Sequence, residues 1–282
     1  MALAASSTAH AFLPDDFGQL LIATASRMSI ALQTTTVVQT DAFEFRIPRV
    51  TAEAGTNWYA ENADITLTDA TLAEEVVRPR KIAGISKLSN ELVGDSSPAA
   101  AQVVGNSLAR SIATGIDAAF FGSADGSGVP PKGIGAFADG DITVVAGPAA
   151  WANVDPFTEA IFKAEAIGAN ITAFIANPAD AEILAKLKKE TGSNEPLLAP
   201  DATSPTTRYL GGVPLWTSSN VAAGSIIGYD ATRTFTVVRN GTEVELDRSV
   251  FFGSYSTAVR AIARVAFGYA HPKSIVRITL ED

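Results

Sequence analysis

The chain of 282 residues is 47 % hydrophobic and only 18 % charged, against roughly 25 % charged residues in an average soluble domain. Its formal net charge of −9 and its lack of a long Lys/Arg run argue against direct binding of nucleic acid through the phosphates. The absence of cysteine excludes disulfides and thiolate metal sites. The chain also has no apolar run of 18 residues or more, so a membrane span is not predicted.

The N-terminal part of the chain is expected to form an arm followed by a strand. We predict that residues 1–40 form this N-terminal arm, with one amphipathic helix from Pro14. A strand is expected at residues 41–50, where apolar side chains alternate. The segment from residue 57 to 93 follows it directly.

In residues 57–93, apolar and polar side chains alternate as in a hairpin of two strands, but the segment carries as many charges as an exposed surface. Ile65 and Leu67 alternate with threonines, as in a half-buried strand. Five acidic residues crowd the same stretch: Glu61, Asp64, Asp69, Glu74 and Glu75. A hairpin so polar has little core of its own, so we expect it to lie against another surface. Because Glu74 and Glu75 are adjacent in a strand, their side chains point to opposite faces, which favours solvated or intersubunit charges over a catalytic pair.

The strongest helix signal lies between residues 95 and 122. Capping residues precede Pro98, which suits the first helical position, and Gly122 ends the run. Apolar residues recur every four positions at Val104, Leu108, Ile112, Ile116 and Phe120. From 98 to 121 the helix would be about 36 Å long at ~1.5 Å per residue. One straight stripe on so long a helix predicts that these five residues pack on a sheet.

The middle of the chain alternates between helices and strands. Residues 123–141 are rich in Gly and Pro and are predicted to be a loop. A helix is expected from Asp155, a short buried strand at residues 173–176, and a second helix capped by Asn177 with Pro178 first inside it. We therefore expect a mixed α/β region here.

From about residue 210 the pattern turns to strands. Asn240-Gly241 stands between two alternating runs, which predicts a two-residue type I′ hairpin. The last segment predicts two further strands, broken at His271-Pro272.

The sequence offers no recognisable catalytic constellation. Its only histidines are His10, in the arm, and His271, which is interpreted as a turn residue without a partner for general-base chemistry. Motifs such as G-x-S-x-G, H-E-x-x-H, the P-loop and G-x-G-x-x-G are missing. We therefore expect a protein that is not an enzyme, without catalytic residues, cofactor or metal. The apolar composition leaves open a large monomer or a chain that buries surface against copies of itself or a partner.

Six short motifs occur in a characteristic order: W-Y-x-E in NWYAE (58–61), KIAGISKLSNELVGDS (81–96), IDAAFFGSADGSGVPPKGI (116–134), IANPAD (175–180), LGGVPLWTSSNVAAG (210–224) and AFGYAHPKSIVRI (266–278). In this order the chain resembles the major capsid proteins of tailed bacteriophages with the HK97 fold. The resemblance covers roughly residues 40 to 280.

This resemblance implies an α+β, HK97-like fold with a peripheral and an axial domain. Residues 1–40 would be the N-terminal arm, and residues 41–130 the first part of the peripheral domain. That part would contain an extended E-loop hairpin (about 50–80) and a long spine helix (about 95–122) on an antiparallel sheet. Residues 131–230 would form a mixed α/β axial domain, and residues 231–282 the second part of the peripheral domain.

The resemblance also implies what the polar hairpin lies against. It would rest on a neighbouring subunit, with intersubunit contacts from Trp58, Glu61, Asp64, Ile65, Leu67, Asp69, Glu74, Glu75, Arg78 and Arg80. The implied function is structural: self-assembly into hexamers and pentamers of an icosahedral phage head around double-stranded DNA. An acidic chain suits such a shell, because tight binding would hinder packaging and release of DNA.

The implied partners are other copies of the chain, a separate scaffolding protein or none, a portal, room for decoration proteins, and packaged DNA bound without sequence specificity. No membrane is involved, no N-terminal cleavage is expected, and the protein would be part of the virion, assembled in the host cytoplasm. Two alternatives stay open: an encapsulin-like shell around a cargo enzyme, and a hydrolase or ligand-binding protein without a recognisable motif.

The chain departs from some relatives at their covalent cross-link, which joins an E-loop lysine to a peripheral-domain asparagine with help from a glutamate. Asp69 stands about where that lysine would be, and residues 256–267 contain neither Asn nor Glu. We therefore expect no cross-linking.

Overall fold

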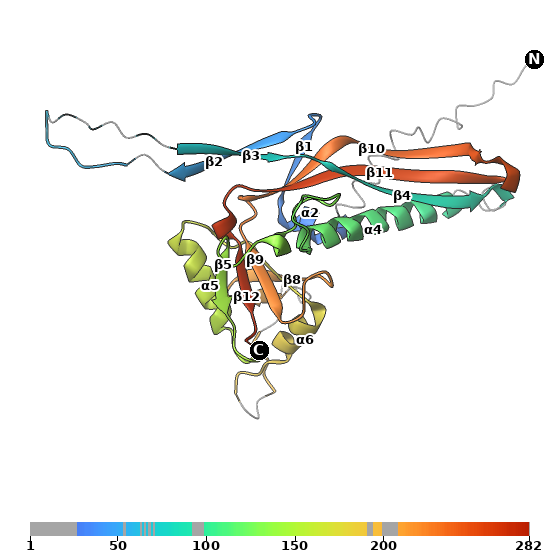
Figure 1. The fold of residues 1–282 in the computed structure, drawn as a ribbon. Coiled ribbons are helices and arrows are strands. Elements are labelled where there is room, and N and C mark those ends of the chain that lie inside the picture. Colours follow the sequence, from blue (N-terminus) through green and yellow to red (C-terminus); the bar gives the residue numbers. More distant parts are fainter. Residues whose placement is uncertain are drawn as a thin grey trace, which may run out of the picture.

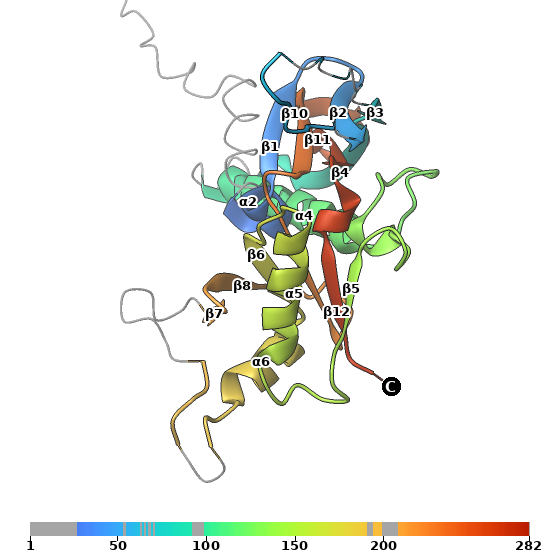
Figure 2. The same ribbon diagram turned by 90° about the vertical axis from the view of Figure 1, so that its left-hand side faces the viewer.

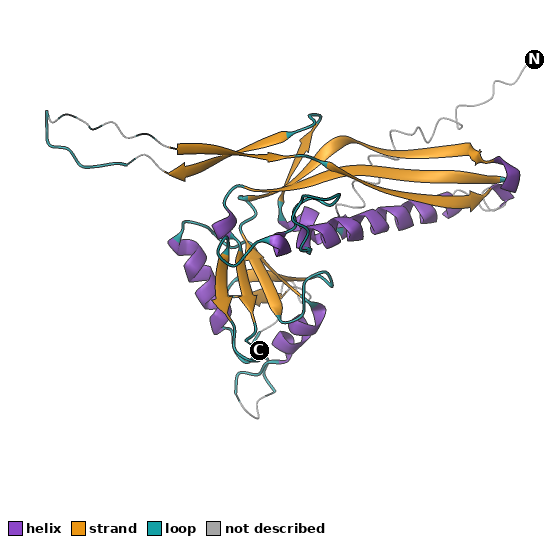
Figure 3. Cartoon of the chain, viewed as in Figure 1, coloured by secondary structure: helices purple, strands orange, loops and turns teal. Residues whose placement is uncertain are grey.

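The computed structural model describes residues 27–52, 55–62, 64, 66, 69, 71–91, 99–190, 194–198 and 208–281. A long four-stranded sheet lies along a long helix, and a six-stranded sheet lies below one end of that helix (Figure 1). A two-stranded ribbon projects from the same end (Figure 3). The described chain is thus α+β, as predicted.

The four-stranded sheet has the strand order β1-β10-β11-β4. Its strands are β1 (Thr36–Thr40), β4 (Arg80–Ser89), β10 (Thr234–Phe251) and β11 (Ser256–Tyr269). β10 and β4 pair antiparallel with β11, but β1 pairs parallel with β10, so the predicted antiparallel sheet has one parallel edge.

The predicted arm of residues 1–40 is wrong at its C-terminal end. The short helix α2 (Ile30–Thr34) packs on the long helix, and β1 joins the sheet by pairing with the start of β10. Residues 30–40 are therefore part of the folded subunit. The helix predicted from Pro14 lies outside the described residues.

The predicted hairpin at Asn240-Gly241 is also wrong. β10 runs through this dipeptide as one strand of 18 residues, with an irregularity in its pairing with β11 between Arg239 and Glu243. The chain instead reverses through the 3-10 turn η3 (Phe252–Ser254), after which Tyr255 has a left-handed backbone (φ 45°). The fourteen residues of β11 supply partners for both halves of β10, which keeps it continuous.

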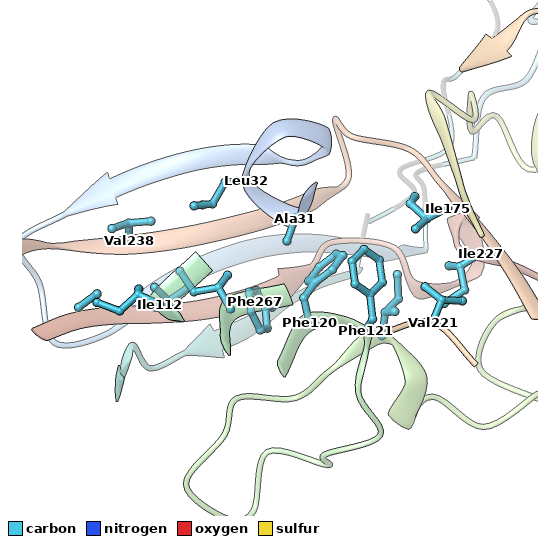
Figure 4. Packing of buried hydrophobic residues seen from close by; sticks show 14 of the residues in the cluster. Ala31, Leu32, Ile112, Phe120, Phe121, Ile175, Val221, Ile227, Val238 and Phe267 are labelled. Atoms are coloured by element: carbon cyan, nitrogen blue, oxygen red, sulfur yellow. The ribbon is translucent and has the colours of Figure 1, made fainter. Parts of the chain in front are cut away.

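The long helix α4 (Ala99–Phe121) lies along one face of the four-stranded sheet (Figure 1). Of its apolar stripe, Leu108, Ile112, Ile116 and Phe120 are buried in the largest hydrophobic cluster, and Val104 is half-buried against it. The Phe120 ring meets Phe267 of β11 edge-on at 5.0 Å between centroids (Figure 4). The predicted capping residues before Ala99 lie outside the described residues.

The six-stranded sheet is mixed, with the order β5-β12-β9-β6-β8-β7. Its strands are β5 (Thr143–Ala146), β6 (Ala173–Ala176), β7 (Arg208–Leu210), β8 (Val213–Thr217), β9 (Ser225–Tyr229) and β12 (Val276–Thr279). Two helices accompany it, α5 (Asp155–Ala166) and α6 (Pro178–Lys186), and Figure 2 shows α5 lying over the strands. Short 3-10 turns are η2 (Ile134–Ala136) and η4 (Pro272–Ser274).

The predicted boundary at residue 231 fails for the last strand. β12 was expected in the second part of the peripheral domain, but it lies between β5 and β9 in the six-stranded sheet. After β11 the chain turns at His271-Pro272 and passes down into this sheet (Figure 1).

Strand β6 connects the two main hydrophobic clusters. Its four residues are all buried, and their side chains alternate between the two faces of the sheet. Phe174 and Ala176 pack in the cluster that contains α5 and α6, whereas Ala173 and Ile175 belong to the cluster around α4. The six-stranded sheet is therefore covered by its own helices on one face and is buried toward the long helix on the other.

Candidate assembly surfaces

The projecting ribbon consists of β2 (Phe45–Ala52) and β3 (Thr71–Val77), which pair antiparallel with each other in a two-stranded sheet of their own. Eight residues at about 3.3 Å each carry its far end roughly 25 Å from its base. An isolated two-stranded ribbon is at best marginally stable in water. Its outer part is therefore a candidate for contact with another molecule.

The base of the ribbon is part of its own subunit's core. Ile47 and Val77 form a small buried cluster with Val237 of β10 and Ala266 of β11. Ile47 also fits against the backbone at Gly268, where an added Cβ would lie 2.1 Å from its Cδ1 atom. The ribbon is thus anchored on the face of the sheet away from α4.

Charges near this base are satisfied within one chain. Arg46 lies 2.9 Å from the Glu74 carboxylate, and Arg78 lies 2.7 Å from that of Glu44. The Glu75 carboxylate accepts a hydrogen bond from the backbone N–H of Tyr269 at 3.2 Å, and its burial raises its pKa.

Glu74, Glu75 and Arg78 thus have partners within their own chain, and the expectation that they also contact a neighbouring subunit stays a prediction. Their partners are Arg46 within β2, Glu44 just before β2, and the backbone N–H of Tyr269 in β11. Arg80, at the start of β4, is exposed.

The loop between β2 and β3 carries the remaining predicted contacts. Trp58 is fully exposed, with a relative accessibility of 104 %, and Glu61, Asp64 and Asp69 are exposed as well. Within the described residues, no ion pair involves these three acids. Ile65 and Leu67 lie outside the described residues.

One hydrogen bond joins the two sides of this loop. The Thr66 backbone N–H donates to the Tyr59 hydroxyl at 3.1 Å, and hydrogen bonding with Thr66 is the main cause of a lowered pKa of Tyr59. The bond links the side chain of Tyr59, the neighbour of Trp58, to the other side of the loop.

A second apolar surface lies at the opposite end of the four-stranded sheet. Val250, Phe252 and Tyr255 are 57 %, 86 % and 65 % exposed around the turn between β10 and β11. Nearby, the Lys87 ammonium lies 5.0 Å from the centre of the Phe251 ring. Sequence reasoning missed this surface, although aromatic residues on both sides of Gly253 are a signal for it.

A buried polar junction, also missed from the sequence, ties α2 to α4. The Asp117 carboxylate accepts hydrogen bonds from the Ser29 hydroxyl at 2.7 Å and from the backbone N–H groups of Ile30 and Ala31 at 3.1 and 3.0 Å. Burial raises the pKa of this carboxyl. One turn later, the Thr34 hydroxyl lies 2.5 Å from that of Tyr229 in the six-stranded sheet.

The described residues show little that could support catalysis. They contain no group of three or more His, Asp or Glu side chains placed to hold a metal ion. His271 lies in the turn before η4, as predicted, and burial together with the nearby Arg233 lowers its pKa, so it is neutral at pH 7. None of the described helices is long and apolar enough to cross a membrane.

Comparisons with known proteins agree on one family. The model of the phage capsid family matches residues 10–280. No curated protein matches the sequence. Among solved structures, the capsid of an empty GTA particle is 22 % identical, with a TM-score of 0.72 over 100 % of this chain and 96 % of that one.

Two phage structures are similar to this chain to a comparable degree. That of Microbacterium phage Oxtober96 is 16 % identical with a TM-score of 0.73, covering 90 % of this chain and 91 % of its own. That of Mycobacterium phage Adephagia is 16 % identical with a TM-score of 0.73, covering 100 % and 95 %. The predicted HK97-like fold is confirmed.

Proposed function

The chain belongs to the phage capsid family, and on this basis we propose that its copies form the hexamers and pentamers of an icosahedral head around double-stranded DNA. It is a structural protein of the virion, a major capsid protein that associates with copies of itself. Enzymatic activity plays no part in the proposed role.

The projecting ribbon is the observation that best supports this proposal. A fully exposed tryptophan on a loop roughly 25 Å from the ribbon's base adds no stability to a monomer. In a ring of subunits, the same loop would reach the next copy. Its contacts would come from Trp58, Glu61, Asp64 and Asp69, with Ile65 and Leu67 between them and Arg80 on the receiving side.

The remaining partners follow from the same role. We propose that the head contains a portal and assembles in the host cytoplasm, with or without a separate scaffolding protein. Its outer surface leaves room for decoration proteins to bind. The net charge of −9 suits an inner surface that holds DNA without gripping it, so packaged DNA would be contacted without sequence specificity.

Electron microscopy of the expressed protein tests the proposal directly. Negative staining is expected to show closed shells or capsomers, and sedimentation velocity is expected to show large particles. A lone species of 29.3 kDa under native conditions contradicts the proposal. Particles filled with one host enzyme instead of DNA would identify an encapsulin-like compartment.

A further inference from the structure

A small apolar groove lies beside the base of the ribbon. Its volume is about 190 Å³, and it is formed by the start of β4, the C-terminal half of α4 and the loop at residues 129–131. Gly115 and Ala119, one helical turn apart on α4, line it, and Val129, which is 76 % exposed, stands at its edge. Phe267 contributes further apolar surface.

The helix and β4 pack closely beside the groove. An added Cβ at Gly115 would lie 2.6 Å from the Ile82 Cδ1 atom, so glycine at this position lets Ile82 pack directly against the helix. The lining is mostly apolar, as is usual for a site that receives an aromatic anchor.

One cation stands at this groove. Arg80 lines it, is exposed, and lies on the same face of β4 as Ile82, whereas the next residue, Lys81, points to the opposite face of the strand. Within the described residues no ion pair involves Arg80. The loop of the ribbon has the complementary character, because Trp58 is followed closely by the exposed acids Glu61 and Asp64. An indole exposes about 150–250 Å² of surface, and tryptophan is typical of the residues that dominate interfaces.

We propose that Trp58 of one copy inserts into this groove of a second copy, with Glu61 and Asp64 facing Arg80. One chain cannot make this contact with itself. Arg80 follows Val77 by three residues and so lies at the base of the ribbon, whereas Trp58 lies in the loop at the far end, roughly 25 Å away.

The contact joins two different surfaces, so each copy gives its Trp58 to one neighbour and receives that of another. Such head-to-tail contacts close into rings when the rotation permits. The inference thus rests on the proposed assembly and names the anchor and the receiving site of its ring contact.

Cysteine pairing tests the proposal, because the natural chain has no cysteine. We expect particles of the double variant Trp58→Cys/Val129→Cys to give, after mild oxidation, a ladder of covalent oligomers on a non-reducing gel. Each single variant, and the double variant Trp58→Cys/Phe252→Cys, serve as controls and should stay monomeric on that gel. Assembled particles without a ladder, or an equal ladder from the Trp58→Cys/Phe252→Cys control, overturn the inference.

A charge exchange keeps Trp58 and covers the case in which its loss prevents assembly. Glu61→Lys and Arg80→Glu should each lower the particle yield at least about tenfold, as close like charges across an interface oppose association. The double variant should restore most of the yield. Single variants that assemble like the wild type, or a double variant that assembles no better than the single variants, contradict this inference but not the proposed function. Wild-type protein that forms no particles contradicts the proposed function itself.

Discussion

Ala52 of β2 and Thr71 of β3 are the outermost register pair of the projecting ribbon. Joining them by Asn-Gly, a sequence suited to a two-residue turn, would remove residues 53–70 and keep the anchored base. We expect this variant to fold, because Ile47, Val77 and the Glu75–Tyr269 hydrogen bond remain. It should not assemble, because the loop with Trp58 is gone. Circular dichroism reports the fold and sedimentation velocity reports the particle.

Two outcomes would contradict this expectation. Normal shells from the shortened chain would mean that the loop makes no essential contact between subunits. An unfolded chain would mean that the loop belongs to its own subunit's core. The shortened chain, if it behaves as expected, also gives a subunit whose unfolding can be measured without a contribution from assembly.

The Asp117 junction should be a large local source of stability in that subunit. Asp117→Ala removes an acceptor of three hydrogen bonds and should lower the free energy of unfolding by about 2 to 3 kcal/mol. Asp117→Asn keeps one oxygen for Ser29 and Ala31 and should cost less. Denaturant unfolding measures both; equal losses would mean that the hydrogen bonds to this carboxylate do not hold the segment.

The raised pKa of Asp117 also gives stability a pH dependence of definite sign. Since burial favours the protonated carboxyl, the folded subunit binds more protons than the unfolded chain above the ordinary aspartate pKa of about 3.9. This contribution is fully present below that value and is lost as the pH rises through the folded pKa.

The free energy of unfolding of the parent subunit, relative to that of Asp117→Asn, should therefore fall as the pH is raised from about 4. The comparison cancels the similar effect of Glu75, which both proteins retain. A difference that is constant or grows with pH contradicts the assignment.

A fourth prediction concerns the apolar stripe of α4. Leu108 is buried against the sheet, and an added Cβ at Gly84 of β4 would lie 3.3 Å from its Cδ2 atom. Leu108→Ala should cost about 2 to 5 kcal/mol of unfolding free energy through lost burial and a cavity. Arg110, exposed on the same helix, is the matched control, and Arg110→Ala should cost far less. Similar melting temperatures for the two variants would place the stripe on the wrong face.

Mature particles should contain no covalent lattice. Residues 50–80 contain no lysine, Asp69 is exposed in the loop, and residues 256–267 of β11 contain neither Asn nor Glu. Boiling in detergent should therefore release single chains. A ladder of oligomers from the wild-type protein on a denaturing gel would overturn this prediction.

Features that depend on neighbouring residues were predictable from the sequence. The period of four along α4 and the cap of α6 are local signals: the Asn177 side chain accepts a hydrogen bond from the Ala179 N–H at 3.1 Å, and Pro178 begins the helix. The exposure of Trp58 and of the acids beside it agrees with a hairpin too polar for a core.

Features that depend on distant residues were not predictable. β1 is a strand because it finds β10, almost two hundred residues later in the chain. The local preference of Asn240-Gly241 for a turn is overridden by pairing along β11, and the real turn places Tyr255 in a left-handed conformation that favours glycine. The ion pairs at the base of the ribbon likewise bring together residues about thirty positions apart.

Phe174 and Ile175 are neighbours in β6 but contribute to different hydrophobic clusters. The six-stranded sheet is consequently not an autonomous folding unit. A fragment cut out for separate expression would expose Ile175, Ile227 and Tyr229 to water and would lack β12, which the chain supplies only after completing the other sheet. Truncation, domain exchange and transplantation of this half are therefore poor strategies for engineering the shell.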